Sequence, residues 1–273
     1  MKLKKILPVS IVLLLVIVSS PAQKTSPPTN AVVPLVDLKL KGLLGGVKAG
    51  KWIKADEVAK GLSEPDEFLL INKTFVEEGG VTTGSLVSPE PPCDQYFGVD
   101  LELESDSGVA IGTGAKWNLF PRKPLKISSD NSIYLRVVQT FLKKNGLEKT
   151  VTKIKEIYKV DLDGDKQDEV VIAGTYYKNG LSPSAAAGDY SFVMVRKIVR
   201  KFTHDIILEG DFIKKDLEFG APNEYDLSAI ADLNGDGKME IVVFGQYYEG
   251  SFSTVFEIEG DKAKRILETG CGV

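Results

Sequence analysis

The stretch DLDGDKQDEVVIAGTYY occupies residues 161–177, and DLNGDGKMEIVVFGQYY occupies residues 232–248. Every matched position is offset by the same 71 residues, with no gap. Each copy starts with an acidic turn and continues into an apolar run; we call residues 161–169 the first loop and residues 232–240 the second loop. A repeat of this kind predicts that the C-terminal half of the chain contains two copies of one β unit.

Side-chain oxygens recur at alternate positions of both loops. Positions 1, 3 and 5 carry them, position 9 is Glu, and the backbone carbonyl of position 7 (Gln167 or Lys238) offers one more. Carboxylates crowded in this way repel one another, and Ca²⁺ is a hard cation that accepts about six to eight oxygens. The loops therefore predict bound calcium. The alternative is an acidic turn without metal, held by hydrogen bonds from the backbone to the Asp and Asn side chains.

The glycines of the loops show where the chain turns. Position 4 is glycine in both copies, whereas position 6 is Gly237 in the second loop and Lys166 in the first. A left-handed backbone at position 6 would cost Lys166 roughly 1 kcal/mol or more. The loop is not an EF-hand, because strands flank it and its closing acid stands at position 9 rather than 12.

The loop followed by a strand that ends in Ala173-Gly174 or Phe244-Gly245 resembles the FG-GAP and VCBS repeats. Those repeats form β-propeller blades in integrin-like and many exported bacterial proteins. The resemblance covers about residues 151–260 and implies antiparallel, propeller-like repeats. Two copies are fewer than the roughly four blades of a closed propeller, so we expect an incomplete or degenerate one. The calcium ligands that it implies by position are Asp161, Asp163, Asp165 and Glu169, with Asp232, Asn234, Asp236 and Glu240.

The remaining patterns predict a mainly β chain with one packing helix. Val170 to Ala173 and Ile241 to Phe244 are apolar on both faces, which is typical of inner strands. Residues 132–145 have a helical apolar side, and Ser129 or Asp130 is the expected N-cap. That apolar side comprises Ile133, Val137, Val138, Phe141 and Leu142.

The region before the helix also reads as β-rich. Short apolar runs separated by Gly, Pro and Ser predict strands between residues 68 and 120, and the glycine-rich residues 42–50 are read as a bend. Alternate acids at Asp100, Glu102, Glu104 and Asp106 are interpreted as a solvated strand face. The expected divisions are a signal peptide (1–22), a proline-rich linker (23–34), a β-rich region (35–130), and the helix with the two repeats (131–273).

The N-terminus predicts export. Met1 to Lys5 is positively charged, Ile6 to Val18 is apolar, and Ser20-Pro21-Ala22 is typical of a cleavage site. An uncleaved anchor is the alternative. In an oxidising compartment Cys93 and Cys271 could form a disulfide bond, and the alternative is two unpaired thiols.

The charge and the histidine content of the chain narrow the range of possible functions. A net charge of −4 argues against nucleic-acid binding. The chain has a single histidine, His204, which we expect at the surface or at a sheet edge, and the sequence contains no nucleophile elbow. We therefore expect an exported, non-catalytic calcium-binding protein for adhesion, surface binding or scaffolding, whose partner is an extracellular or cell-surface protein or glycan. The alternatives are a secreted carbohydrate-active hydrolase with paired carboxylates, and a membrane-tethered accessory subunit that retains its apolar N-terminal segment.

Overall fold

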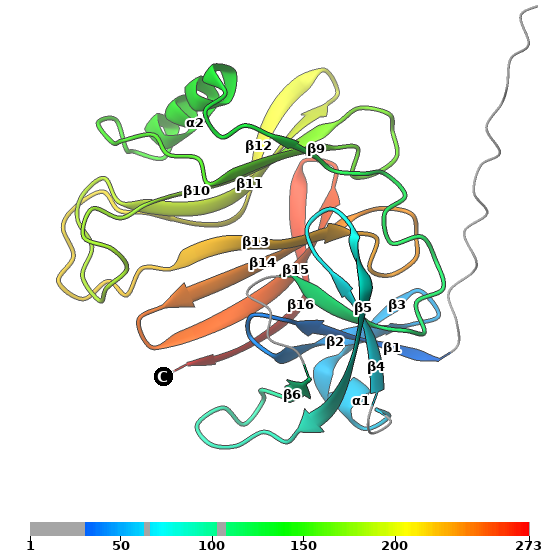
Figure 1. The fold of residues 1–273 in the computed structure, drawn as a ribbon. Helices are drawn as coiled ribbons and strands as arrows, with labels where there is room; N and C mark the ends of the chain where they lie inside the picture. The colour runs from blue at the N-terminus through cyan, green and yellow to red at the C-terminus, as the bar shows by residue number, and fades with distance from the viewer. Residues whose placement is uncertain (1–30, 63–65, 103–107, 273) are drawn as a thin grey trace, which may run out of the picture.

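The computed structural model describes residues 31–62, 66–102 and 108–272 (Figure 1). The described chain is mainly β, and its strands form a closed six-stranded barrel, a five-stranded sheet and a four-stranded sheet. All strand pairings between described strands are antiparallel, as the repeats led us to expect. The expected signal peptide lies outside the described residues. Strand β1 (Val32–Asp37) begins within the last residues expected as linker.

The N-terminal β-rich region forms the barrel. Its ring order is β1-β7-β4-β5-β6-β2, which the pairing of β2 with β1 closes, and β3 pairs with β2 beside the ring. Helix α1 (Ala55–Ala59) packs Val58 into one of the barrel's apolar clusters. The other bounds are β2 (Gly42–Lys48), β3 (Lys51–Lys54), β4 (Asp66–Ile71), β5 (Val76–Val87), β6 (Gly98–Leu101) and β7 (Val109–Gly112).

Glycine makes β2 a strand where we expected a bend. A Cβ atom on Gly45, whose φ is +136°, would lie 2.5 Å from the carbonyl oxygen of Ile53, and one on Gly46 would lie 2.6 Å from that of Val33. The glycines therefore allow neighbouring strands to approach closely. The expectation of a bend over residues 42–50 was wrong for most of this stretch, and the chain turns only after Lys48.

The two sequence copies form two sheets with matching strands. The inner strands, β10 (Glu169–Tyr176) and β14 (Glu240–Tyr247), have the same burial at all eight positions. The first sheet has the order β12-β11-β10-β9-β8 and the second β13-β14-β15-β16. Their other bounds are β8 (Leu125–Ile127), β9 (Glu156–Val160), β11 (Tyr190–Val199), β12 (Phe202–Phe212), β13 (Glu224–Ala231), β15 (Gly250–Glu259) and β16 (Lys262–Gly272).

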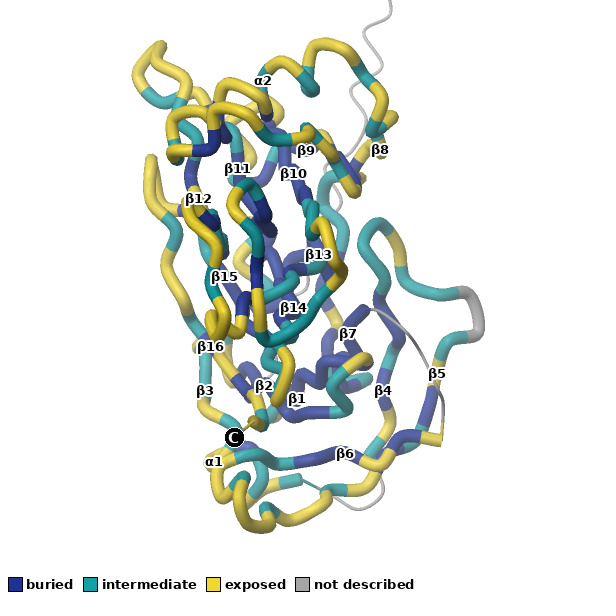
Figure 2. Tube along the Cα trace, turned by 90° about the vertical axis from the view of Figure 1, so that its left-hand side faces the viewer, coloured by how far each residue is buried: buried dark blue, intermediate teal, exposed yellow. Residues whose placement is uncertain are grey.

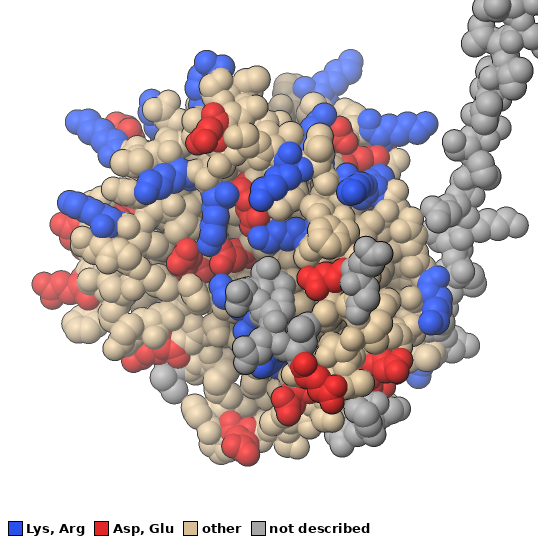
Figure 3. All heavy atoms as spheres, viewed as in Figure 1, with Lys and Arg blue, Asp and Glu red and all other residues tan. Residues whose placement is uncertain are grey.

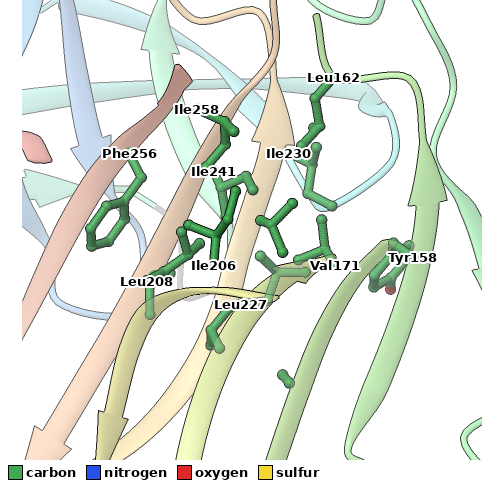
Figure 4. Close-up of a cluster of buried hydrophobic side chains, with 14 of the residues drawn as sticks. Tyr158, Leu162, Val171, Ile206, Leu208, Leu227, Ile230, Ile241, Phe256 and Ile258 are labelled. Atoms are coloured by element: carbon green, nitrogen blue, oxygen red, sulfur yellow. The ribbon is translucent and has the colours of Figure 1, made fainter. Parts of the chain in front are cut away.

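The elements stack in four layers (Figures 1 and 2). The two sheets face each other across an apolar cluster to which Val171 and Leu208 of the first sheet and Leu227 and Ile241 of the second belong (Figure 4). Helix α2 covers the other face of the first sheet, and the barrel covers the other face of the second. Both inner strands are therefore buried on two sides, which explains their continuous apolar sequence.

Helix α2 (Ser132–Lys144) confirms the predicted packing helix. It buries Val138, Phe141 and Leu142 against the first sheet, with the Phe141 ring 4.9 Å from that of Phe192. The cap differs from expectation, because the side chain of Asn131 accepts the hydrogen bond from the backbone N–H of Ile133. Asn131 directly precedes the first helical residue, so neither Ser129 nor Asp130 can take this position. Ile133, which we expected on the apolar side, lies in the first turn of the helix and is 59% exposed.

A disulfide bond joins Cys93 and Cys271, whose Cα atoms lie 5.4 Å apart. It connects the β5–β6 segment of the barrel to the end of β16. A disulfide bond fits a protein that resides outside the cytoplasm. Among the described residues, no helix is long and apolar enough to cross a membrane.

Polar contacts join the barrel to the sheets. Lys73 in the β4–β5 turn binds Glu156 of β9 at 2.8 Å, and Lys39 binds Asp226 of β13 at 3.1 Å. The hydroxyl of Ser253 donates a hydrogen bond to Asp37, which is fully buried. On the face shown in Figure 3, Lys and Arg side chains are most frequent over the upper half, with Asp and Glu between and below them.

A buried acid, Glu209 of β12, connects the edge strands of the two sheets. Its Oε2 accepts a hydrogen bond from Arg265 of β16 at 2.7 Å, while its buried Oε1 has no hydrogen-bond partner among the described residues. Burial raises the pKa of Glu209 to about 7, although the charge of Arg265 opposes the shift.

A raised folded-state pKa makes stability depend on pH. The native state binds the Glu209 proton more tightly than the unfolded chain does, so the added stability is complete below about pH 4.5 and is lost as the pH rises through about 7. Glu209→Gln should remove this dependence and stabilise the protein at pH 8 by at most about 3 kcal/mol. Urea unfolding at pH 5 and pH 8 measures the free energy of unfolding at each pH. If this free energy fell by the same amount between the two pH values in wild type and variant, the prediction would be contradicted.

Candidate metal centre

The two loops connect equivalent strands and share one backbone conformation. The carboxylate of Asp161 accepts hydrogen bonds from the N–H groups three and five residues later, at 2.7 and 3.0 Å. Asp232 accepts the same two bonds at 2.7 and 2.9 Å. The sequence repeat is therefore also a repeat of conformation, down to single hydrogen bonds.

The closing glutamates also match. Glu169 Oε2 accepts a hydrogen bond from the N–H of Leu162 at 2.8 Å, and Glu240 Oε2 accepts one from Leu233 at 2.8 Å. The acid at position 5 accepts from the amide of position 7 at 2.7 Å in each copy. These bonds define the acidic turn. They leave the second oxygen of each glutamate for another partner.

Position 6 has the left-handed backbone that the glycine pattern indicated. The φ angle is +71° at Lys166 and +83° at Gly237. Lys166 is exposed. Its conformation costs roughly 1 kcal/mol or more, which the repeated hydrogen bonds of the loop must offset.

In the first loop three predicted ligands come together. Asp161, Asp163 and Glu169 place one carboxylate oxygen each within 4.8 Å of one another, and no other group of three Asp, Glu, His or Cys does so within the described ranges. Asp165 is not part of this group and instead binds the backbone and side-chain amides of Gln167. Of the residues predicted for the first loop, the structure thus gathers three.

A lysine that the loop sequence does not reveal enters this group. Lys197 of β11 is 4% exposed at its side chain, and its Nζ lies 2.6 Å from Asp163 Oδ2 and 3.0 Å from Glu169 Oε1. Burial alone would raise the pKa of Asp163, but the hydrogen bond and charge of Lys197 outweigh it and hold that pKa below its usual value. The group of acids therefore already contains a cation.

Positions 1 and 3 of the second loop are more deeply buried than those of the first, and no described lysine forms an ion pair with an acid of the second loop. Asp232, Asn234 and Glu240 are each at most 3% exposed. Burial raises the pKa of Asp232 to about 6, and burial together with the charges of Asp232, Asp236 and Glu257 raises that of Glu240 well above its usual value. Buried carboxylates in this state favour either a proton or a cation.

A cavity of about 30 Å³ adjoins the second loop, enough for one water-sized species. Neither Asp236 Oδ2 nor Glu240 Oε1 accepts a hydrogen bond within the described chain, and both residues line the cavity. Glu257 of β15 and Lys238 line it as well, as do Leu162 and Asp163 of the first loop. Carboxylate and amide oxygens are the donors that Ca²⁺ prefers, and Asp236 and Glu240 are the two predicted ligands of the second loop that line this cavity; Asp232 and Asn234 do not.

Residues 115–122, which we call the strap, form hydrogen bonds with the backbone of both loops. The Trp117 indole donates a hydrogen bond to the carbonyl of Asp232 at 2.9 Å. Arg122 donates to the carbonyl oxygens of Leu162 and Gly237 at 2.9 and 2.7 Å, and it also contacts that of Asp161. A Cβ atom on Gly235 would lie 2.9 Å from the Trp117 ring. The strap therefore fixes the position of one loop relative to the other.

Four residues of this region are outside the predicted ligand set: Trp117, Arg122, Lys197 and Glu257. All four are distant from the loops in sequence. Only the strand register could have indicated Lys197 and Glu257, because each lies next to a closing glutamate across a strand pair. No pattern within the loops points to Trp117 or Arg122.

Other candidate sites have weaker geometry. An open cavity of about 660 Å³ between α1, residues 94–97 and β16 is lined by Asp56, Asp94, Arg265 and Glu268, among others. His204 lies in the edge strand β12, as expected, with its Nδ1 3.8 Å from Asp261. Asp100 is exposed on β6 between the buried Val99 and Leu101, and Glu102 is exposed just after the strand, whereas Glu104 and Asp106 lie outside the described residues.

No protein-family model, curated protein or solved structure matches this chain. The resemblance to FG-GAP and VCBS repeats consequently rests on the two loops and the strands that follow them. The functional argument rests on the donor atoms, the buried charges and the disulfide bond described above.

Proposed function

We propose that this chain is an exported, non-catalytic β-repeat protein of the FG-GAP/VCBS type, in which bound calcium stabilises the fold. The observation that carries the proposal is the second loop, where Asp232 and Glu240 are buried and form no ion pair with a described Lys or Arg. A buried carboxylate without a counter-charge is strongly unfavourable. A calcium ion would supply that charge, accept oxygens from Asp232, Asn234, Asp236 and Glu240, and fix the turn.

The disulfide bond supports placing the protein outside the cytoplasm. Together with the N-terminal signal pattern it favours a secreted, periplasmic or cell-surface protein. We propose that the partner is an extracellular or cell-surface protein or glycan, and that the rigid stack of barrel and sheets presents a binding surface. Screening the calcium-loaded protein on a glycan array and against surface proteins tests this role.

A secreted carbohydrate-active hydrolase is the second candidate. The cavity of about 660 Å³ favours it, because three acidic side chains, Asp56, Asp94 and Glu268, line that space. Glycosidases use a pair of carboxylates on either side of the scissile bond. Release of reducing sugar from a panel of polysaccharides, abolished by Asp94→Asn, would favour this candidate over a binding role.

Calcium should raise the melting temperature, and chelator should lower it. A ligand that binds only the native state at 100 times its dissociation constant adds about 2.7 kcal/mol, or about 5 to 10 °C for a chain of this size. Glu240→Gln should abolish the response, because it removes a buried charge while keeping an acceptor for Leu233. Differential scanning calorimetry with calcium and with chelator measures both effects.

The chelated Glu240→Gln protein should be at least as stable as chelated wild type, because the raised pKa means that the buried charge itself is unfavourable. Glu249→Gln is the matched control, because Glu249 is exposed and lies outside both loops. An equal calcium response in wild type and Glu240→Gln would show that the ion binds elsewhere.

A further inference from the structure

Lys197 and Glu257 occupy equivalent places in the two sheets. Val170 of β10 pairs with Arg196 of β11, so Glu169 and Lys197 come next along these strands. Ile241 of β14 pairs with Phe256 of β15, so Glu240 and Glu257 come next in the same way. The two repeats therefore place opposite charges beside their closing glutamates.

We propose that the Lys197 ammonium substitutes for the metal ion in the first loop, and that the protein binds one calcium ion, in the second loop, with Glu257 as an additional ligand. This rests on the proposed function, which requires a calcium site but assigns no different roles to the loops. It gives Lys197 a structural role and adds Glu257, from outside the repeat motif, to the metal site.

The contacts of Lys197 leave little for an ion. Its Nζ lies between Asp163 Oδ2 and Glu169 Oε1, at 2.6 and 3.0 Å, and these acids belong to the one close acidic group of the described chain. A calcium ion in this group would have to displace a buried ammonium or lie beside it. Either outcome is unfavourable, because like charges repel most strongly where water is excluded. The first loop is therefore complete without metal.

The second loop has the opposite arrangement. Glu257 Oε1 accepts a hydrogen bond from the Trp52 indole of the barrel at 2.6 Å, which fixes the carboxylate at the cavity. Glu240, 1% exposed, lines the same cavity with an oxygen that has no partner within the described chain. Among the described lysines, Lys264 alone lies within 4.0 Å of a Glu257 carboxylate oxygen, and its side chain is 60% exposed; Lys238 lines the same cavity and is also exposed. A water-sized space that is lined by several carboxylates, one of them fixed by Trp52, indicates a bound cation.

Ion stoichiometry and charge exchange between the two positions test the inference. Isothermal titration with Ca²⁺ and native mass spectrometry should find one ion per wild-type chain and none in Glu257→Lys. Lys197→Glu gives the first sheet an acid at the position equivalent to Glu257, and this variant should bind two calcium ions. Lys201→Glu and Glu249→Lys make the same charge changes at exposed positions and should leave one ion bound.

The outcomes separate the two proposals. Two ions in wild type, or one ion that survives Glu240→Gln, would overturn the inference and leave calcium binding intact. No ion in wild type would overturn both. If Lys197→Glu does not fold, Lys197→Gln serves instead, because it removes the ammonium and keeps a polar side chain. It should melt at a lower temperature than wild type in chelator and regain stability in calcium. A Lys197→Gln protein that still binds a single ion and melts like wild type in chelator would contradict a cation-like role for Lys197.

Discussion

Trp117→Ala should destabilise the protein by roughly 3 to 5 kcal/mol, the usual cost of truncating a buried aromatic side chain. Trp117 is 6% exposed and belongs to the apolar cluster between the barrel and the second sheet. It also lies against Gly235 and donates a hydrogen bond to the carbonyl of Asp232. The substitution should therefore loosen the second loop and weaken calcium binding, which urea unfolding in chelator and titration with Ca²⁺ measure separately.

Phe68→Ala is the matched control for this prediction. Phe68 is fully buried in the apolar cluster of the barrel that contains neither loop. Its truncation should cost a similar free energy of unfolding, with calcium affinity unchanged. Trp117→Phe should retain most of the packing and lose only the hydrogen bond to Asp232. Equal losses of calcium affinity in Phe68→Ala and Trp117→Ala would show that the effect is global and does not depend on the strap.

The sequence was most informative where structure is local or repeated. The runs that are apolar on both faces predicted β10 and β14 as inner strands, and the helical apolar pattern predicted α2 nearly to the residue. These patterns predicted the structure well because each of them depends on a single helix or strand and not on how distant elements pair. The predicted N-cap, Ser129 or Asp130, was one or two residues too early, because the cap is Asn131. Ile133 was expected on the apolar side of the helix but is exposed. Both differences lie at the helix start, where helix boundaries are hardest to locate.

The barrel could not be predicted in the same way. Its closure depends on two pairings between strands that are distant in sequence, β1 with β7 and β2 with β6, whereas β1 and β2 are joined by a short turn. The glycines of β2 suggest a bend when read alone, and they form a strand only because β1 and β3 approach them closely. Lys197 and Glu257 could not be assigned to the loops for a related reason. Their positions beside Glu169 and Glu240 follow from the strand register, which the sequence alone does not give.

The layers also explain how two repeats suffice. In a propeller each blade covers the apolar face of its neighbour, and two blades would leave two outer faces exposed. Here α2 covers one outer face and the barrel covers the other. The strap continues from the barrel across both loops, so the parts that cover the repeats also position their acidic turns. The two sheets are thereby buried on both faces without closing a ring.

Removing the disulfide bond should have an effect as large as that of Trp117→Ala. Cys93 and Cys271 are 178 residues apart, so the bond restricts a large part of the unfolded chain. In the chain-entropy model a loop of this size stabilises the native state by about 4 to 5 kcal/mol. The Cys93→Ser, Cys271→Ser double variant should therefore unfold at much lower urea concentration than the oxidised wild type.

The same bond fixes the end of β16, an edge strand of the second sheet whose Leu267 packs against the barrel. In the double variant, amide hydrogen exchange should increase first near the C-terminus, with little change in β10 and β14, which are buried on both faces. Reduced wild type is the control, because it lacks the bond but retains both side chains. If the oxidised wild type and the double variant differed by less than about 1 kcal/mol, the unfolded chain would already hold these ends together, and the entropic account would fail.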